Sequence, residues 1–448
     1  MAVGKSQDGR VVFVEGPVPG DVLDVKILRK KKGFFQGIPE SYRSYSAERV
    51  EPACQHFEDC GGCKWQHLNY PAQLQEKERI VQDAMRRIAK VEVKNWSPIL
   101  SAPASFFYRN KMEFSFSNQR WKTKSEVQNG DIITDSQEAL GLHPPKFFNK
   151  VVQIEECLLM DSFCDQVRNF VGDYARKHQL EFYDPVKHTG FLRNMIIRNT
   201  TLGEWMLVLS FAYEDRERRE ALQEAVKMKF ESISSFHYVI NKKMNDTLFD
   251  QEMKLVAGKP YIEERFDNIH FKIRPKSFFQ TNPVQAKHLY DIVKDFADLQ
   301  KNEIVYDLYT GTGSIALYVA QNCGTIVGVE EVPDAIEDAK DNAEFNMISN
   351  AHFYVGDVKN VFTAELLERH GHPDCVITDP PRAGMHADVI HSLLSMRPAK
   401  IIYISCNPAT QARDIQMLSA DYSVEKMRPV DMFPHTNHIE NVALLRRK

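Results

Sequence analysis

The stretch EIVYDLYTGTGS, residues 303–314, decides the fold of the C-terminal half of this chain. Its apolar run has the length of a buried strand, and Gly311 and Gly313 mark a tight turn before a helical pattern. The same order of strand, loop and helix returns at TIVGVE, AHFYVGD, DCVITDPPR and KIIYISCNP. Strands that alternate with helices predict a parallel sheet with crossover helices, the doubly wound α/β class.

A polar residue ends each of these predicted strands, where a purely structural strand would not require one. In doubly wound sheets, ligands bind outside the carboxyl ends of the strands, so these side chains are expected to share one site. The glycine loop has neither the spacing of a dinucleotide fingerprint nor the lysine of a phosphate loop. Taken alone, it fits S-adenosylmethionine (SAM) as well as NAD. The strand-end residues are Asp307, Glu330, Asp357, Asp379 and Cys406.

Cys406 has two interpretations. A cysteine at a strand end is commonly a small apolar side chain in the core. A thiolate in a ligand site is instead a good nucleophile and a good leaving group. Uracil methylation requires both properties, because a thiolate that adds to carbon 6 makes carbon 5 reactive and must later depart. A base must then remove the proton at carbon 5, and Glu440 is the candidate, with His435 and His438 as alternatives.

Several motifs together resemble the RNA uracil-5 methyltransferase family: KSFFQTN (276–282), DLYTGTG (307–313), GVE, DPPR, SCNPAT and FPHTNHIE (433–440). The resemblance covers the catalytic half and implies a Rossmann-like SAM-dependent methyltransferase domain, with Cys406 as nucleophile and Glu440 as base. The glycine loop departs from the family at Tyr309 and Ser314, where Phe-Cys and a later Asn are frequent. By this resemblance the SAM and uracil pocket is lined by Gln280, Tyr309, Ser314, Glu330, Asp357 and Asp379.

CQHFEDCGGC, residues 54–63, contains three of the eight cysteines of the chain, and EECLLM adds Cys157. Without a signal segment, this composition argues against a disulfide framework and for metal chemistry. Four thiolates suit zinc or an iron–sulfur cluster, and the single C-x2-C pair slightly favours the cluster. The resemblance is closest to the 23S rRNA (uracil-C5)-methyltransferase subgroup, which implies a 4Fe-4S cluster on Cys54, Cys60, Cys63 and Cys157.

The first 50 residues consist of short predicted strands separated by Gly and Pro turns. Seven basic residues lie between Lys26 and Arg49, against two acidic ones. Such a patch can attract phosphate although the net charge of the chain is -4, or it can be an ordinary solvated surface. The subgroup resemblance implies a TRAM domain here, an OB-like RNA-binding small β-barrel.

YPAQLQEKERIVQDAMRRIAK, residues 70–90, predicts an amphipathic helix, and residues 100 to 270 are mostly predicted strands. The apolar residues near helical spacing in that segment are Leu74, Ile80, Val81, Ala84 and Ile88. We therefore expect a TRAM-like barrel over 1–50, a mainly β central domain carrying the cluster over 51–275, and a catalytic domain over 276–448.

The leading hypothesis is SAM-dependent methylation of carbon 5 of a specific uridine in 23S rRNA. A tRNA uracil-5 methyltransferase would use the same chemistry. A non-catalytic RNA-binding protein on a methyltransferase fold is disfavoured because Cys406, Asp379 and Glu440 are all present, and a cytosine-5 enzyme because its nucleophile usually follows a proline. We expect a monomer with RNA as partner, without DNA or membrane binding. The absence of a hydrophobic signal segment or spanning run predicts a cytoplasmic location.

Overall fold

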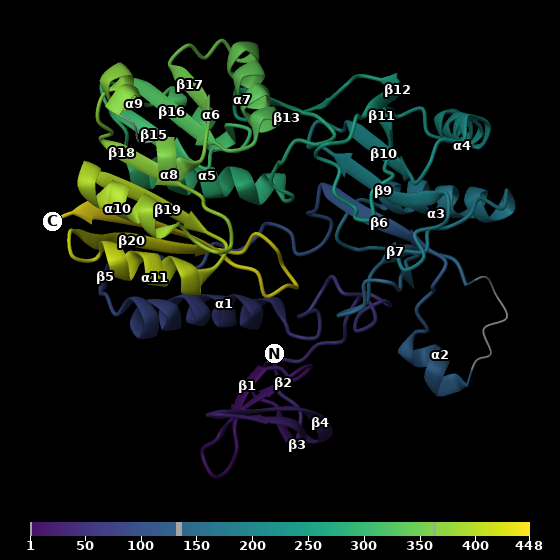
Figure 1. Ribbon diagram of the computed structural model, residues 1–448. Helices are drawn as coiled ribbons and strands as arrows, with labels where there is room; N and C mark the ends of the chain where they lie inside the picture. The colour runs from purple at the N-terminus through teal and green to yellow at the C-terminus, as the bar shows by residue number, and fades with distance from the viewer. Residues whose placement is uncertain (1, 131–136, 362–363) are drawn as a thin grey trace.

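The computed structural model describes residues 2–130, 137–361 and 364–448, which form three units (Figure 1). The C-terminal α/β unit and the central sheet lie side by side, and the N-terminal strands lie below them in this view. Within the described part of the chain, no helix has the length and apolarity that crossing a bilayer requires.

The N-terminal unit is a four-stranded sheet with the order β1-β2-β4-β3. β2 and β4 are parallel, and the other two pairs are antiparallel. No pairing between the edge strands β1 and β3 is present within residues 2–130, so the closed barrel stays a prediction while the sheet is observed. The strands are β1 (Ala2–Lys5), β2 (Val11–Val14), β3 (Val22–Lys31) and β4 (Phe34–Ser44).

The central unit is a seven-stranded sheet with the order β12-β11-β10-β9-β6-β7-β8, antiparallel except for the pair β10–β11. Its core contains apolar side chains of two helices, among them Val171 and Leu222, together with the inner strands. The strands are β6 (Lys111–Ser117), β7 (Ala139–Leu142), β8 (Val152–Gln153), β9 (Leu192–Asn199), β10 (Trp205–Phe211), β11 (Ile233–Ile240) and β12 (Lys254–Gly258), and the helices are α2 (Lys124–Asn129), α3 (Ser162–Lys177) and α4 (Arg216–Lys229).

The C-terminal unit is an eight-stranded sheet with the order β17-β16-β15-β18-β19-β21-β20-β5. The predicted parallel α/β arrangement is confirmed, because β15 to β19 are all parallel, and only β21 runs antiparallel to both of its neighbours. The strand order reverses between β15 and β18, which is where doubly wound sheets bind ligands. The strands are β5 (Val93–Trp96), β15 (Ile304–Leu308), β16 (Thr325–Glu330), β17 (Ala351–Val355), β18 (Cys375–Thr378), β19 (Lys400–Ser405), β20 (Tyr422–Val430) and β21 (Glu440–Arg447).

Helices cover this sheet and follow the strands as the sequence predicted. They are α5 (Pro283–Ala297), α6 (Ser314–Ala320), α7 (Pro333–Phe345), α8 (Val358–Val361), α9 (Ala364–His370), α10 (Ala387–Met396) and α11 (Pro408–Leu418).

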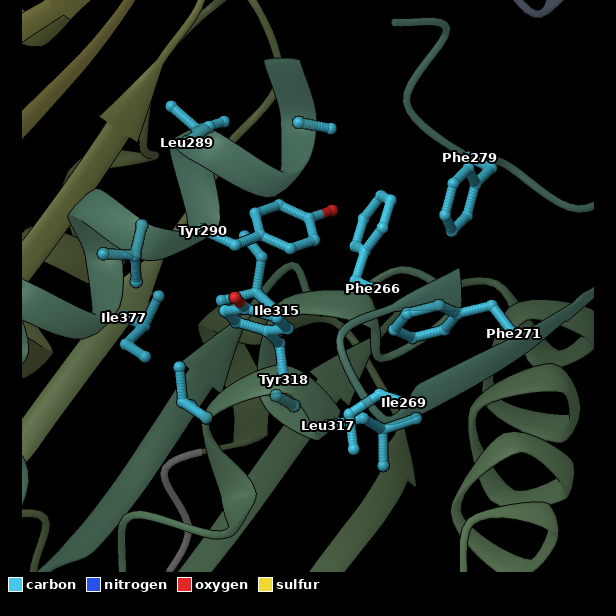
Figure 2. Packing of buried hydrophobic residues seen from close by; sticks show 14 of the residues in the cluster. Phe266, Ile269, Phe271, Phe279, Leu289, Tyr290, Ile315, Leu317, Tyr318 and Ile377 are labelled. Atoms are coloured by element: carbon cyan, nitrogen blue, oxygen red, sulfur yellow. The ribbon is translucent and has the colours of Figure 1, made fainter. Parts of the chain in front are cut away.

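A hairpin of β13 (Ile262–Phe266) and β14 (Ile269–Ile273) packs aromatic side chains against α5 and α6 (Figure 2). Phe279 is buried in this cluster, with its ring 5.5 Å from that of Phe266 and 5.6 Å from that of Phe271. Its neighbour Phe278 is 68% exposed. The buried Phe279 ring thus anchors the KSFFQTN segment, and the Phe278 ring beside it stays exposed, where a ligand can contact it.

α1 (Tyr70–Ala84) and a π-helical turn, Met85–Ala89, confirm the helix predicted over residues 70–90. The buried face agrees with the expected one only in part: Val81 and Ala84 are buried, but Ile80 and Ile88 are exposed. Gln73 and Lys77 are fully buried instead. α1 packs against α11, and β5 pairs with β20, so residues 70–96 join the C-terminal unit rather than the central one.

Candidate active site

Cys406 lies between the end of β19 and the start of α11 and keeps part of its surface exposed. Asn407 caps α11 by accepting a hydrogen bond from the Ala409 backbone N–H at 3.1 Å, and Pro408 occupies the first helical turn. The strand therefore ends at Ser405, and Cys406 lies just beyond the carboxyl end of β19. The location contradicts the interpretation of Cys406 as a core side chain.

A cavity of about 1950 Å³ opens at the carboxyl ends of the parallel strands. It is larger than the usual small-molecule pocket, as expected for a site that takes more than one ligand. All of the residues proposed from the sequence for catalysis and for SAM or uracil binding line it. They are Gln280, Tyr309, Ser314, Glu330, Asp357, Asp379, Cys406 and Glu440.

The glycine loop forms one wall of this cavity. Gly311 has a φ of 54°, a Cβ added there would meet no described atom within 4 Å, and the Gly311 backbone N–H donates to the Glu330 carboxylate at 3.2 Å. Gly313 caps α6 with a φ of 74°, and a Cβ there would lie 2.9 Å from the Phe353 ring. Both positions therefore favour glycine, and the loop backbone can approach a ligand closely.

Acidic side chains around the strand ends are held in a low-dielectric setting. Burial raises the pKa of Asp307 and of Asp379 to about 7. Burial, and then the charge of Asp379, raise the pKa of Glu440 well above its ordinary value, while the Arg382 guanidinium opposes the rise. Carboxyl groups with raised pKa values hold protons more strongly and are candidates for proton transfer.

Arg382, the last residue of DPPR, was not singled out by the sequence analysis although the motif contains it. Its backbone carbonyl accepts hydrogen bonds from Asn407 Nδ2 at 3.1 Å and from Thr410 Oγ1 at 3.2 Å. Its guanidinium contacts the His438 ring. Burial and the charges of Glu440 and Asp379 raise the pKa of the Cys406 thiol, and Arg382 is the cation that lowers it.

The two histidines that rival Glu440 as base occupy different environments. His438 lines the cavity and contacts Arg382. His435 is buried, and its ring lies against Phe106 with the ring centroids 4.4 Å apart. Burial lowers the pKa of His435 to about 4. His435 is not among the residues that line this cavity, so of the three candidates the structure places His438 and Glu440 where a base could act.

The four cysteines proposed as cluster ligands belong to two segments, residues 54–63 and the turn that begins at Cys157, and all four are partly exposed. Burial, and then the neighbouring thiols, raise the pKa of Cys60 to about 11, and they raise the pKa of Cys63 as well. For Cys157 burial is again the main cause, with Cys60 and Cys63 adding to it, and the pKa reaches about 12. Within the described ranges, no three His, Cys, Asp or Glu side chains are close enough to hold a single metal ion.

A second cavity, of about 1990 Å³, lies between the N-terminal sheet and the C-terminal unit. Its walls include Phe35 of β4 and Cys60 and Cys63 of the cysteine segment. Arg382, Cys406 and His438 line both cavities. Cys406 thus borders both the strand-end cavity and the space beside the N-terminal sheet.

Comparison with known proteins connects this geometry to a family. The sequence model described as tRNA (Uracil-5-)-methyltransferase matches residues 200–448. A relative from Bacteroides thetaiotaomicron, named as an uncharacterized RNA methyltransferase, is 47% identical over 447 residues, covering 99% of this chain and 98% of its own length. One from Porphyromonas gingivalis with the same description is 49% identical over 446 residues, covering 98% and 96%.

The chain is also similar to a solved structure over its whole length. This is the crystal structure of Pyrococcus abyssi tRNA (uracil-54, C5)-methyltransferase in complex with S-adenosyl-L-homocysteine. The two are 28% identical in sequence with a TM-score of 0.74, and the match covers 99% of each chain.

Proposed function

This chain belongs to the tRNA (uracil-5-)-methyltransferase family, and we propose that it methylates carbon 5 of a specific uridine in 23S rRNA with SAM as the methyl donor. The observation that carries the chemistry is the position of Cys406 and Glu440. Ser405 pairs with Asn441 in the antiparallel ladder of β19 and β21, so Cys406 and Glu440 are opposed at its end. A nucleophile and a base on adjacent strands can act on one pyrimidine ring.

In the proposed reaction, the Cys406 thiolate adds to carbon 6 of uracil, and the electron pair of the 5,6 double bond moves toward carbon 5 and oxygen 4. Carbon 5 then takes the methyl group, which SAM supplies as an electrophile and releases as it becomes the neutral thioether. Glu440 removes the proton from carbon 5, and that electron pair rebuilds the double bond. The carbon–sulfur bond to Cys406 breaks, and the thiolate leaves.

Electrostatics around the thiol fits these roles. Arg382 favours the ionised forms of both Cys406 and Glu440. Once ionised, a carboxylate whose pKa is raised by burial is a stronger proton acceptor than an exposed one. Phe278, exposed at the cavity wall, offers a face on which a base can stack.

The strand-end cavity has features that a SAM molecule would need. The open space beside Gly311 admits a ligand against the loop backbone, and Glu330 and Asp357 at the ends of β16 and β17 can accept hydrogen bonds from hydroxyl groups. In this proposal Gln280, Tyr309, Ser314 and Asp379 complete the cofactor and uracil contacts. Ser314 is held by Tyr290, whose hydroxyl lies 2.7 Å from Ser314 Oγ.

We further propose that the four-cysteine segment holds a 4Fe-4S cluster with a structural role. Cys54, Cys60, Cys63 and Cys157 are the ligands, and their raised pKa values mean that cationic iron would be needed to keep them as thiolates. Each thiolate of such a cluster binds a different iron, so its ligands lie further apart than those of a single ion. The absence of a compact single-ion group among the described residues is compatible with this arrangement.

RNA is proposed to enter beside the N-terminal sheet, which we interpret as the TRAM-like barrel. Lys30 lies 6.0 Å from the Phe35 ring centroid, and Lys31 lies 5.8 Å from that of Phe34. Exposed cations next to aromatic rings suit a single-stranded nucleic acid. The second cavity leads from this sheet to Cys406. A monomer in the cytoplasm is part of the same proposal.

A tRNA substrate is the second candidate, supported by the tRNA enzyme that resembles this chain over its whole length. Mapping 5-methyluridine in rRNA and tRNA from cells with and without the protein distinguishes the two. Loss of one 23S rRNA position would support the first proposal, and loss of a tRNA position would establish the second. An unchanged 5-methyluridine map in both RNA classes would contradict both.

A further inference from the structure

Residues 431–439, here called the catalytic loop, connect β20 to β21 and end immediately before Glu440. Its course determines where the Glu440 carboxyl and the His438 ring stand relative to Cys406.

This connection is longer than a tight hairpin turn, so the loop needs contacts of its own to adopt one conformation. Two of its contacts come from the start of α5, where Asn282 Nδ2 donates to the Met432 carbonyl at 2.9 Å and Gln285 Nε2 donates to the Asp431 carbonyl at 3.1 Å. The contacts of His435 and of the Asp431 side chain come from the N-terminal part of the sequence, mainly from α1 and from the segment after Cys63.

Lys77 and Gln73 lie four residues apart on α1 and therefore point from the same face of the helix. Neither side chain is exposed to solvent. Lys77 Nζ donates to Asp431 Oδ1 at 2.6 Å and to the carbonyl oxygen of Phe433 at 3.0 Å. Burying an ammonium group is costly, and an apolar pair of similar volume would often be as stable. The hydrogen bonds of Lys77 have defined directions, however, and they hold the loop at two places, the Asp431 side chain and the Phe433 carbonyl.

Gln73 fixes a third point. Its Nε2 lies 3.1 Å from His435 Nδ1, and its Oε1 accepts the His435 backbone N–H at 2.9 Å. The same Nε2 donates to the carbonyl oxygens of Leu68 at 2.7 Å and Trp65 at 3.0 Å. His435 has a φ of 63°, a left-handed conformation that a non-glycine residue adopts only when its surroundings impose it.

The segment that follows Cys63 binds the same residue from its other side. The carbonyl oxygen of His435 accepts hydrogen bonds from the backbone N–H groups of Lys64 at 2.8 Å and Trp65 at 2.9 Å. The Tyr108 hydroxyl donates to the Pro434 carbonyl at 3.1 Å. His435 is therefore held on its N–H, its carbonyl and its ring, which explains its burial away from the cavity.

We propose that Gln73 and Lys77 are positioning residues for methyl transfer, and that through His435 and Asp431 they hold the catalytic loop so that Glu440 stands opposite Cys406. This inference rests on the proposed function, because it assigns the two side chains to the proton-removal step. Neither side chain lines the strand-end cavity, so each acts through the loop. The last step of the reaction depends most on Glu440, whereas thiolate addition and methyl transfer depend on Cys406 and SAM.

The two halves of the reaction can be separated with 5-fluorouridine. A fluorine at carbon 5 cannot leave as a cation, so the base step is blocked and the methylated Cys406 adduct persists. Formation of this adduct requires addition and methyl transfer but no proton removal. If Gln73 and Lys77 position Glu440, replacing them should slow turnover on uridine RNA but leave adduct formation on 5-fluorouridine RNA nearly unchanged. General unfolding would reduce both rates.

The test uses the full-length protein, radiolabelled SAM, and in vitro transcripts of 23S rRNA or tRNA, whichever the parent protein methylates, made with uridine or 5-fluorouridine. We expect Gln73→Leu to slow turnover on uridine RNA by at least about tenfold, since small misplacements of catalytic groups cost up to about a hundredfold. Labelled adduct should accumulate on denaturing gels with uridine RNA. Adduct formation with fluorouridine RNA should stay within about threefold of the parent rate, below the effect of a misplaced group.

Gln82→Leu is the matched control, because Gln82 is exposed on the same helix and its side chain donates to Glu78 at 3.3 Å, within α1 itself. It should match the parent with both RNAs. The double variant Lys77→Met/Asp431→Leu removes the ion pair without leaving a buried charge, and it should reproduce the Gln73→Leu pattern even if that single variant folds poorly.

Equal losses on both RNAs in the folded variants, or unchanged turnover on uridine RNA, would overturn the positioning role. Failure of the proposed function itself looks different, because the parent protein would then form no adduct with fluorouridine RNA and release no methylated RNA.

Discussion

Cys406 and Glu440 stand opposite each other at one end of the β19–β21 ladder, because their neighbours Ser405 and Asn441 are register partners. Cys406 directly follows the last residue of β19, and Glu440 is the first residue of β21, so both are attached to the end of one backbone ladder and need only short-range contacts to be placed. The two groups are also linked electrostatically, since the Glu440 charge raises the pKa of Cys406.

Replacing the thiol tests the nucleophile. We expect Cys406→Ala to lower methyl transfer by at least about a thousandfold, as for loss of other covalent nucleophiles. SAM affinity, measured by titration calorimetry, should be nearly unchanged because the thiol has no required contact with the donor. Cys323→Ala is the matched control, since Cys323 is buried in the core and does not line the cavity. Near-normal turnover of Cys406→Ala would return this residue to a purely structural role.

Glu440→Gln tests the base. The amide keeps the size of the side chain but cannot take the proton from carbon 5, so the ring cannot expel the thiolate. We expect a covalent protein–RNA adduct that already carries the methyl group and survives denaturation. A gel with radiolabelled SAM detects it as a labelled band shifted by the RNA. His438→Gln is the comparison, and accumulation of adduct in that variant alone would move the base role to His438.

The pH dependence of turnover should follow the raised pKa of the thiol. The thiolate is the reactive form, so a raised pKa leaves a smaller ionised fraction at any pH below it, and kcat/KM should climb through about pH 7 to 9 without an early plateau. Arg382→Gln removes the cation that favours ionisation of both Cys406 and Glu440. It should shift the rising limb to higher pH, whereas Arg382→Lys should shift it less. A plateau below about pH 7 in the parent would contradict this.

The strands and helices of the catalytic unit could be predicted well, because each can be recognised from its own short stretch of residues. Each strand there is an apolar run closed by Gly, Pro or an acid, and parallel strands bring their carboxyl ends together regardless of their distance in sequence. The residue pattern alone was therefore sufficient to place Asp307, Asp379 and Cys406 in one site. Glu440 was proposed from its carboxylate and its place beside the last predicted strand, but the residues left His435 and His438 as alternatives, because an antiparallel strand brings its first residue rather than its last to this end of the sheet.

The role of α1 could not be predicted from periodicity. Apolar spacing predicted the burial of Val81 and Ala84 correctly, but Ile80 and Ile88 are exposed. The buried face also carries Gln73 and Lys77, which no apolar pattern could indicate. Their partners His435 and Asp431 lie more than 350 positions away in the sequence. A polar side chain looks solvent-exposed in a helical pattern unless its hydrogen-bonding partner is known. For the same reason, the sequence could not show that His435 is a buried structural residue rather than a candidate base.

Iron content tests the cysteine segment. We expect anaerobically purified protein to be brown, with about four irons per chain, the number for one cluster of this type. Cys60→Ser should lose most of the iron, because it removes one of four ligands. Cys164→Ser is the control, since Cys164 is buried in the central core and is not one of the proposed ligands. Stoichiometric zinc without iron in the parent protein would contradict the cluster and leave a zinc site.

Salt dependence tests the RNA contacts of the N-terminal sheet. Lys30 and Lys31 are exposed beside Phe35 and Phe34, so they can neutralise phosphates while the rings contact bases. Each phosphate contact contributes about 0.7 to the slope of log affinity against log salt for a single strand, because bound counterions are released. Lys30→Ala/Lys31→Ala should therefore reduce the slope by about 1.4 and weaken RNA binding most at low salt.

SAM affinity of this double variant should be unchanged, because neither lysine lines the strand-end cavity. Lys177→Ala/Lys229→Ala removes two exposed lysines from α3 and α4, which lie on the central unit away from the N-terminal sheet (Figure 1). It loses the same net charge, so any effect of total charge on RNA binding will appear there too. If both double variants lower the salt slope equally, the N-terminal sheet makes no specific phosphate contacts, and the RNA path must be sought along the central unit.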